Sequence, residues 1–150
     1  MKDLKIIITA VGSPGSATNI RYLKSVEERK IFLIGTDLNH DKIGKHWCDK
    51  FYTVPKGEDE GFIPRLLEII RKEKPDVLFP QSSSEVIPLS RNKDILEKEG
   101  VKVLISSEKA VYEAENKAEL YKSLKDGPVK IPKFRIVNSL SDFLDAVKAL

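Results

Sequence analysis

Four short apolar runs, separated by stretches with helical periodicity, constrain the fold of this 150-residue chain more than any other feature. Each run is continuous and rich in β-branched or large apolar residues, which is typical of strands buried on both faces of a parallel sheet. Strands that alternate with helices favour right-handed crossovers, which place helices on both sides of the sheet. The sequence therefore predicts an α/β fold, a three-layer α/β/α Rossmann-like parallel sheet. Its expected central strands are residues 6–9, 31–34, 77–79 and 103–105.

Amphipathic stretches predict helices between these strands, over residues 17–24, 58–74 and 85–99, and a shorter extended piece over residues 51–55. Ser16 is the expected N-cap of the first helix, and Ser83 or Ser84 that of the third, because hydroxyl side chains satisfy the free amides of a helix start. Pro64 fits the second helix only in its first turn, where the missing N–H costs no hydrogen bond.

The pattern changes beyond Ser106, where shorter elements follow without a long apolar run. They are predicted helices over residues 108–115 and 116–125, a strand-like piece over 134–137 and a helix from 141. We therefore expect two parts: a Rossmann-like domain over residues 1–107, and a helical linker with the beginning of a further domain over residues 108–150.

Charge and cysteine content exclude several classes of protein. The 26 Lys and Arg residues are dispersed among 23 Asp and Glu residues, and a net charge of +3 is too small to indicate nucleic-acid binding. Cys48 is the only cysteine, which excludes a disulfide-stapled secreted scaffold. The apolar run near the N-terminus is too short for a signal peptide or a membrane span. The expected location is the cytoplasm, with neither a membrane nor a nucleic acid as partner.

The loop after the first strand is the first candidate for ligand binding. In a doubly wound sheet, ligands bind outside the carboxyl ends of the strands. Here Gly12, Ser13 and Gly15 precede a helix, whose free backbone amides favour an anion or a carboxylate. Alternatively, the two glycines only allow a tight turn between strand and helix.

Asp37 follows the second strand, at a spacing from the glycines where a dinucleotide-binding fold holds a ribose. The glycines lack the G-x-G-x-x-G order of that fold, and Pro14 stiffens the loop near the place where a pyrophosphate would approach. Asp37 is therefore either a ligand-binding residue at the rim of the site or a turn residue.

The third candidate is the polar loop over residues 81–85, between the third strand and the next helix. Capping the helix needs one hydroxyl, and the further polar side chains indicate a ligand. Ser82, Ser83 and Glu85 are the candidates for contacting a substrate. We expect this loop and the glycine loop to lie side by side on a shared concave surface.

No metal site and no catalytic residue is predicted within the sequence. The nearest candidates for metal ligands, His40, His46, Cys48 and Asp49, match no zinc-binding spacing. Trp47 is expected to anchor its loop to the core rather than to stack on a nucleotide.

The order of several segments resembles that in the first domain, or pre-ATP-grasp domain, of ATP-grasp ligases, with carbamoyl-phosphate synthase large chains as the most similar members. The matching segments are residues 8–15, 35–37, 47–55, 75–80 and 100–107. Residues 115–125, followed by 131–134, resemble the Asp-Lys helix and the Ile-Pro turn of the same family. The resemblance extends over nearly the whole chain.

This resemblance implies that Lys117 contacts the phosphates of ATP, although Asn116 replaces the usual aspartate of the motif. Such ligases use ATP and Mg²⁺ to phosphorylate a carboxylate, and an amine then displaces the phosphate. The metal-binding carboxylates lie in later lobes that this sequence does not include. The chain is therefore expected to be a fragment that is inactive alone, and to need those lobes in cis or on a partner chain.

Two other functional classes remain open. One is a stand-alone nucleotide- or dinucleotide-binding module, favoured by the glycine loop and Asp37; the other is a regulatory or assembly domain. The resemblance implies a small carboxylate or amine as substrate, whereas the polar loops by themselves fit amino acids, carboxylates and small phosphates alike. The sequence leaves the oligomeric state open, a homodimer included.

Overall fold

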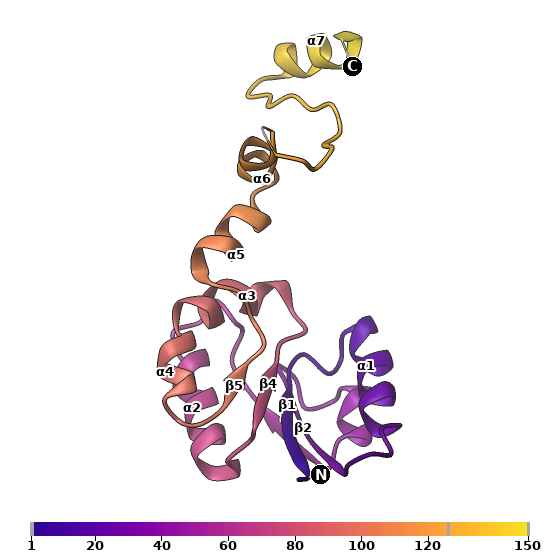
Figure 1. Cartoon of the computed structure of the whole chain (residues 1–150), viewed down its shortest axis with the longest axis vertical. Helices are drawn as coiled ribbons and strands as arrows, with labels where there is room; N and C mark the ends of the chain where they lie inside the picture. The colour runs from indigo at the N-terminus through magenta and orange to yellow at the C-terminus, as the bar shows by residue number, and fades with distance from the viewer. Residues whose placement is uncertain (1, 126, 150) are drawn as a thin grey trace. The chain divides into compact units, whose positions relative to one another are not determined.

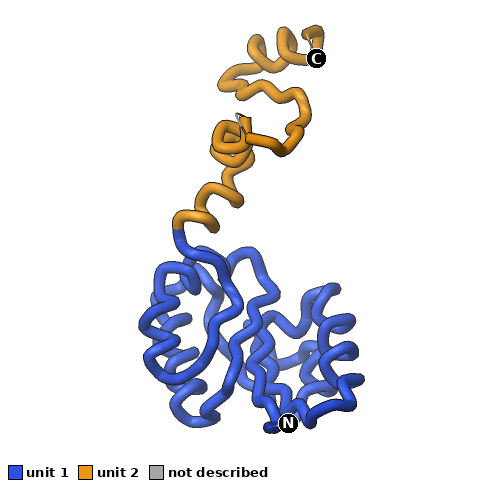
Figure 2. Tube along the Cα trace, in the orientation of Figure 1, with its two compact units in different colours: residues 1–108 blue, residues 109–150 orange. Residues whose placement is uncertain are grey.

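The computed structural model describes residues 2–125 and 127–149. The chain divides into two compact units, Met1–Glu108 and Lys109–Leu150 (Figure 2). None of the helices in the described part of the chain has the length and apolar character needed to span a bilayer.

The first unit contains a five-stranded sheet in which every pair of neighbouring strands is parallel (Figure 1). The strand order is β3-β2-β1-β4-β5. The strands are β1 (Leu4–Ile8), β2 (Ile31–Asp37), β3 (Lys50–Thr53), β4 (Val77–Phe79) and β5 (Lys102–Val103). The predicted parallel, Rossmann-like α/β fold is confirmed.

The strands alternate their side chains between two hydrophobic clusters, one on each face of the sheet. Ile7 belongs to one cluster, with residues of α2 (Phe62–Glu73), α3 (Ser83–Arg91) and α4 (Lys93–Glu97). Ile6 and Ile8 belong to the other, with Ile20 of α1 (Pro14–Lys24). Because β1 is buried from both sides, its run of isoleucines is continuous rather than alternating with polar residues.

The prediction that residues 103–105 form a central strand is wrong. The strand is β5, which has two residues and lies at the edge of the sheet, paired only with β4. Val103 is buried, but Leu104 is 50% exposed. The apolar run therefore belongs to a half-covered edge strand, which has the same composition as a central one. The extended piece predicted over residues 51–55 forms the opposite edge, β3.

The predicted cap of the first helix is also wrong. The helix α1 begins at Pro14, and Ser13 rather than Ser16 occupies the N-cap position. Ser16 is fully buried, and its hydroxyl donates to the Ala10 carbonyl over 2.7 Å. Its hydrogen bond therefore stabilises the turn that leads into the helix.

The helix predicted over residues 85–99 is two helices, α3 and α4, divided at Asn92. The Asn92 side chain donates to the Pro88 carbonyl over 2.9 Å, so it competes with the backbone for this acceptor. The helix α3 begins at Ser83 with Ser82 at the N-cap position, so neither Ser83 nor Ser84 is the cap.

The helix predicted over residues 58–74 begins later, at Phe62. The residues before it form a turn in which the Lys56 amide donates to the Asp59 carboxylate. Pro64 lies in the first turn of α2, as predicted.

The second unit contains α6 (Lys117–Leu124) and α7 (Leu140–Ala149), preceded by α5 (Glu108–Glu115), which begins at the last residue of the first unit. Residues 134–137, which were predicted to be strand-like, lie in the connection between α6 and α7. Within the described part of this unit no strand is available to pair with them.

Candidate functional site

The carboxyl ends of β1 and β4 meet in a hydrogen-bonded cluster around Thr9. The Thr9 hydroxyl donates to the Glu85 carboxylate, and it accepts a hydrogen bond of 3.0 Å from the Gln81 amide. Thr9 and Glu85 are 76 residues apart in the sequence. No local sequence pattern singles out Thr9, because it continues an apolar run, and only the pairing of distant segments gives it a polar role.

Glu85 is a buried acid rather than a loop residue at the surface. It is the third residue of α3 and is 5% exposed. Burial raises the pKa of Glu85 to about 7; the hydrogen bond from Thr9 opposes this rise, and the negative charge of Asp37 adds to it. A glutamate at this helical position commonly turns back to cap the helix start, but Glu85 turns to Thr9.

The loop before α2 packs against the start of α3, close to Glu85. A Cβ atom at Gly57 would lie 2.4 Å from the Ser84 carbonyl oxygen and 2.9 Å from the Glu85 Cα. Gly57 therefore allows two backbone segments to touch, which contributes to the burial of the acid.

Thr36 adds a second buried hydroxyl at the same end of the sheet. Ile8 of β1 and Gly35 of β2 are partners in the sheet, and Thr9 and Thr36 are the residues that follow them. The two threonines therefore occupy matching positions on neighbouring strands. Thr36 is fully buried, and its Oγ1 atom has no hydrogen-bond partner among the residues that the structure describes. A buried hydroxyl without a partner is costly in free energy and rare in folded proteins, so Thr36 needs a specific explanation, of which a role in ligand binding is one.

Asp37 holds the glycine loop through its carboxylate. Its Oδ2 atom accepts from the Gly12 amide over 2.8 Å, and its Oδ1 atom accepts from the Asn39 amide over 3.3 Å. Asp37 is only 7% exposed. Of the two interpretations of this residue, the contacts favour the turn residue.

The side chain of Lys42 lies across Gly12. No pattern in the sequence indicates this contact. A Cβ atom at Gly12 would meet the Lys42 Cδ at 2.5 Å and the Asp37 Oδ2 at 3.0 Å. The absence of a side chain at Gly12 therefore lets the lysine stem lie over the loop. Ala10, just before the loop, has a positive φ of 46°, a conformation that is uncommon for residues other than glycine.

The polar loop is bonded to the helix α1 that follows the glycine loop. Asn19 of α1 donates a hydrogen bond to the Gln81 side chain. Within each loop the hydroxyls pair: Ser13 with Ser16 over 2.6 Å, and Ser82 with Ser84 over 2.9 Å. Binding of a ligand on a concave surface shared by the two loops stays a prediction, for all seven residues named from the sequence: Gly12, Ser13, Gly15, Asp37, Ser82, Ser83 and Glu85.

The residues considered for metal binding are not assembled into a site. No group of three or more His, Cys, Asp or Glu side chains that could hold a metal occurs among residues 2–125 and 127–149. Burial raises the pKa of Cys48 to about 11, and its thiol donates to the Gly44 carbonyl, so it stays protonated at neutral pH. Of the three aromatic residues expected to anchor this segment, Phe51 and Tyr52 pack against the core clusters, whereas Trp47 is 44% exposed.

Lys117 belongs to the second unit, where it is the exposed first residue of α6. Asn116 caps this helix, accepting from the Ala118 amide over 3.1 Å and the Glu119 amide over 3.3 Å. Asparagine therefore serves as well as aspartate at this N-cap, and its replacement of the usual aspartate leaves the helix start intact.

We expect the substitution Gly15→Ala to raise the free energy of unfolding by about 0.5–1 kcal/mol, because alanine favours the helix and restricts the unfolded chain. No described atom lies within 4 Å of a Cβ built at Gly15, so packing does not require glycine there. Gly12→Ala, which must displace Lys42, is the control and should lower the same quantity. Urea denaturation followed by circular dichroism measures both, and a destabilised Gly15→Ala variant would contradict the prediction.

Comparison with known proteins identifies a family and a shared fold. The family model described as "PylC-like, N-terminal domain" matches residues 6–104. N5-carboxyaminoimidazole synthetase from Staphylococcus aureus complexed with ADP superposes with a TM-score of 0.65 at 18% identity, over 98% of this chain and 36% of that chain. Glycinamide-RNase-transformylase T from Mycobacterium tuberculosis superposes with a TM-score of 0.67 at 19% identity, over 94% of this chain and 37% of that chain. The biotin carboxylase subunit of pyruvate carboxylase superposes with a TM-score of 0.61 at 14% identity, over 97% of this chain and 32% of that chain. The chain thus spans about a third of the length of these structures, and at these identities the likeness shows the fold.

Proposed function

The chain belongs to the PylC-like N-terminal domain family, and we propose that it is the substrate-binding N-terminal domain of an ATP-dependent carboxylate–amine ligase. Its sheet has the fold of the N-terminal domains of ATP-grasp enzymes, which its sequence also resembles. The observation that carries the proposal is the buried Glu85, held by Thr9 beneath two polar loops at the strand ends.

This arrangement suits a substrate that has both an amine and an acidic group. A buried carboxylate favours a cationic partner, so Glu85 would hold the ammonium group of the substrate. The Gly15 amide at the start of α1 and the ammonium group of Lys42 would hold a carboxylate, since Pro14 has no N–H and the Ser16 amide already donates to the Ser13 carbonyl. An amino acid or a similar zwitterion combines these two groups.

The segment over residues 108–150 would supply the linker and the beginning of the ATP-grasp lobe. In the complete ligase, ATP transfers its γ-phosphoryl group to a substrate carboxylate, and an amine attacks the resulting acyl phosphate and releases phosphate. Lys117 would contact the ATP phosphates. Mg²⁺ would neutralise charge on the phosphate oxygens, and its ligands would come from further lobes, since the described residues contain no cluster suited to a metal.

The apolar stripe on α7 supports the idea that further chain packs on the second unit. Its members recur at helical spacing and are all more than half exposed: Leu140, Phe143, Leu144 and Val147. Such a stripe normally faces a core. In the proposed ligase, the following part of the ATP-grasp lobe would cover it.

The chain alone is expected to bind Mg-ATP weakly or not at all, and not to hydrolyse it. One charge-assisted contact from Lys117 contributes roughly 1.5–3 kcal/mol, which does not offset the several kcal/mol of association entropy by enough for micromolar affinity. Calorimetric titration with Mg-ATP, repeated on Lys117→Ala, tests this. Micromolar binding by the unmodified chain would contradict the prediction and favour a nucleotide-binding module built on the glycine loop.

The substrate proposal is tested with a panel of L-amino acids, followed by the backbone amide signals of the chain in NMR spectra. We expect one member of the panel to shift signals of residues 12–16 and 81–85, with binding that strengthens as the pH rises through about 7 and Glu85 ionises. Glu85→Gln should weaken this binding at least tenfold. Glu73→Gln is the matched control, because Glu73 is equally buried but bonded to Lys50 and Tyr52 away from the loops. Shifts that do not involve either loop, or equal binding by both variants, would refute the proposed site.

A further inference from the structure

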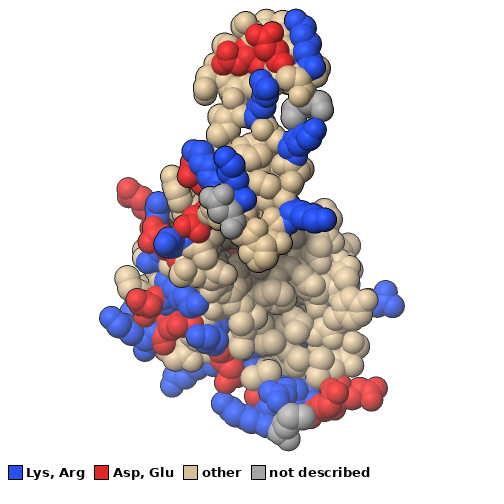
Figure 3. Space-filling model, turned by 45° about the horizontal axis from the view of Figure 1, so that its top comes forward, with Lys and Arg blue, Asp and Glu red and all other residues tan. Residues whose placement is uncertain are grey.

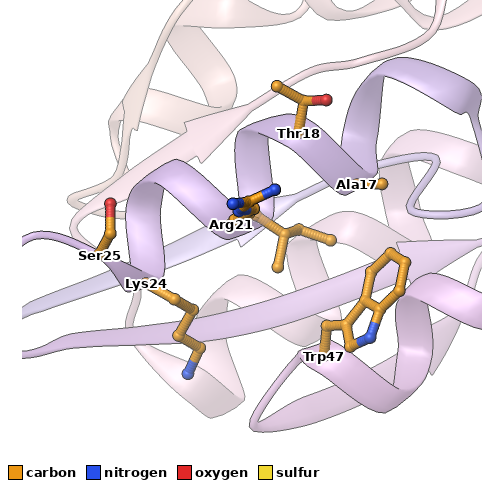
Figure 4. Close-up of a pocket in the computed structure, with 7 residues that line it drawn as sticks. Ala17, Thr18, Arg21, Lys24, Ser25 and Trp47 are labelled. Atoms are coloured by element: carbon orange, nitrogen blue, oxygen red, sulfur yellow. The ribbon is translucent and has the colours of Figure 1, made fainter.

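A groove of about 670 Å³ runs along α1, separate from the strand-end loops. Its lining begins at Ala17 and continues through Lys24 to Ser25, just past the end of the helix, and Trp47 of the 3₁₀ helix η1 (Ile43–Trp47) forms the facing wall (Figure 4). Volumes between about 300 and 1,000 Å³ are typical of sites for small molecules. The groove is therefore large enough for a single compact ligand.

The walls of the groove are mostly apolar. Ile20 is 2% exposed and belongs to the core cluster beneath α1. Trp47, in contrast, presents 44% of its surface to solvent, although a large aromatic residue gains most by burial. Trp47 is the only tryptophan in the sequence, and Figure 4 shows its indole ring open to the groove. These surfaces suit the face of a planar, apolar ring.

The cations of the groove are not equivalent. Lys24 is neutralised by Asp49, whose carboxylate lies 2.5 Å from its ammonium group. Arg21 is exposed, and no carboxylate pairs with it within the described residues 2–125 and 127–149. On the face shown in Figure 3, charged side chains of the first unit gather on the side covered by α2 and α4 and along the lower edge, and the surface between them is largely uncharged. The groove therefore offers one free positive charge on an apolar background.

We propose that this groove binds a planar aromatic ligand with a single carboxylate. The ring would lie against Trp47 and over Ile20, and the carboxylate would form a paired hydrogen bond with the Arg21 guanidinium. The Thr18 hydroxyl, also on the lining, would contact the same anionic group. This site is independent of the strand-end loops and of Glu85, so it assigns to the chain a second ligand besides the ligase substrate.

Trp47 allows a direct test by fluorescence. The probes are 4-nitrobenzoate and its neutral counterpart 4-nitrobenzamide, which have the same ring and the same ability to quench indole fluorescence. We expect quenching by 4-nitrobenzoate to saturate, and 4-nitrobenzamide to bind at least about tenfold more weakly, since it lacks the charge-assisted contact. Quenching that rises without saturation, and equally for both probes, would overturn the proposal.

Matched variants assign the effect to the groove. Arg21→Gln should reduce the affinity for 4-nitrobenzoate to that for the amide. Arg135→Gln, which removes the same charge from an exposed residue of the second unit, should leave it unchanged. Glu85→Gln should also leave it unchanged, so this test succeeds or fails independently of the proposed ligase site.

Sedimentation velocity tests whether a second copy of the chain occupies the groove instead. Self-association that buries Trp47 and is lost in Arg21→Gln would assign the groove to that second copy and overturn the proposal.

Discussion

Replacing Gly44 with alanine is expected to lower the free energy of unfolding by about 3 kcal/mol, at the upper end of the usual cost of overpacking. A Cβ atom at this position would lie 2.0 Å from the Val11 carbonyl oxygen and 2.8 Å from the Val11 carbonyl carbon. Both atoms are backbone, so the clash cannot be relieved by rotating a side chain. The 3₁₀ helix η1 and the segment after β1 would have to move apart.

This displacement should also reach the candidate site, because Val11 precedes the glycine loop and its amide donates to the Thr36 carbonyl over 3.1 Å. Urea denaturation followed by circular dichroism gives the change in stability, and NMR signals of residues 12–16 report the change at the loop. Gly15→Ala is the control, since no described atom lies near its Cβ position and it should stabilise the chain. Equal unfolding midpoints for Gly44→Ala and the unmodified chain would contradict the prediction.

The sequence was sufficient to predict a parallel sheet because its strands are continuous apolar runs separated by helical stretches. The runs over residues 6–9 and 31–34 consist almost entirely of large apolar side chains, and the helical stretches between them leave a parallel sheet as the simple arrangement. The sequence was not sufficient to distinguish an edge strand from a central strand. The segment over residues 103–105 is as apolar as a central strand, yet only one neighbour, β4, pairs with β5.

The sequence predicts at which end of the sheet a site is expected, but it does not predict the contacts found there. The topology brings the carboxyl ends of β1 and β4 together, so both loops were predicted to be neighbours from chain order alone. Thr9, which is bonded to Glu85, and Lys42, which lies over Gly12, come from parts of the chain that carry no polar motif. The burial of Glu85 depends on the packing of Gly57 against α3, a tertiary contact that leaves no local pattern in the sequence.

Burial of Glu85 should make the stability of the chain fall as the pH rises from about 4.5 through 7. The pKa of this carboxyl is about 7 in the folded chain, against an ordinary value of 4.5, so the folded state holds a proton that the unfolded state releases. The contribution is complete below pH 4.5 and is lost as the pH rises through the folded pKa. A shift of this size corresponds to about 3 kcal/mol.

The variant Glu85→Gln has no carboxyl to ionise and should lack this loss. We expect the free energy of unfolding of Glu85→Gln, relative to the unmodified chain, to increase by about 3 kcal/mol between pH 4.5 and pH 8, as measured by urea denaturation at each pH. The comparison between the two proteins cancels the titration of the other groups.

Glu73→Gln is the control with the opposite sign. Burial raises the pKa of Glu73, but hydrogen bonds from Lys50 and Tyr52 lower this pKa below its ordinary value overall. The stability that Glu73 contributes is therefore present above its ordinary pKa and lost on acidification, so its substitution should alter the acid side of the profile only. A Glu85→Gln profile parallel to that of the unmodified chain from pH 4.5 to 8 would show that Glu85 is ionised at its ordinary pKa, and hence that water reaches it in the folded state.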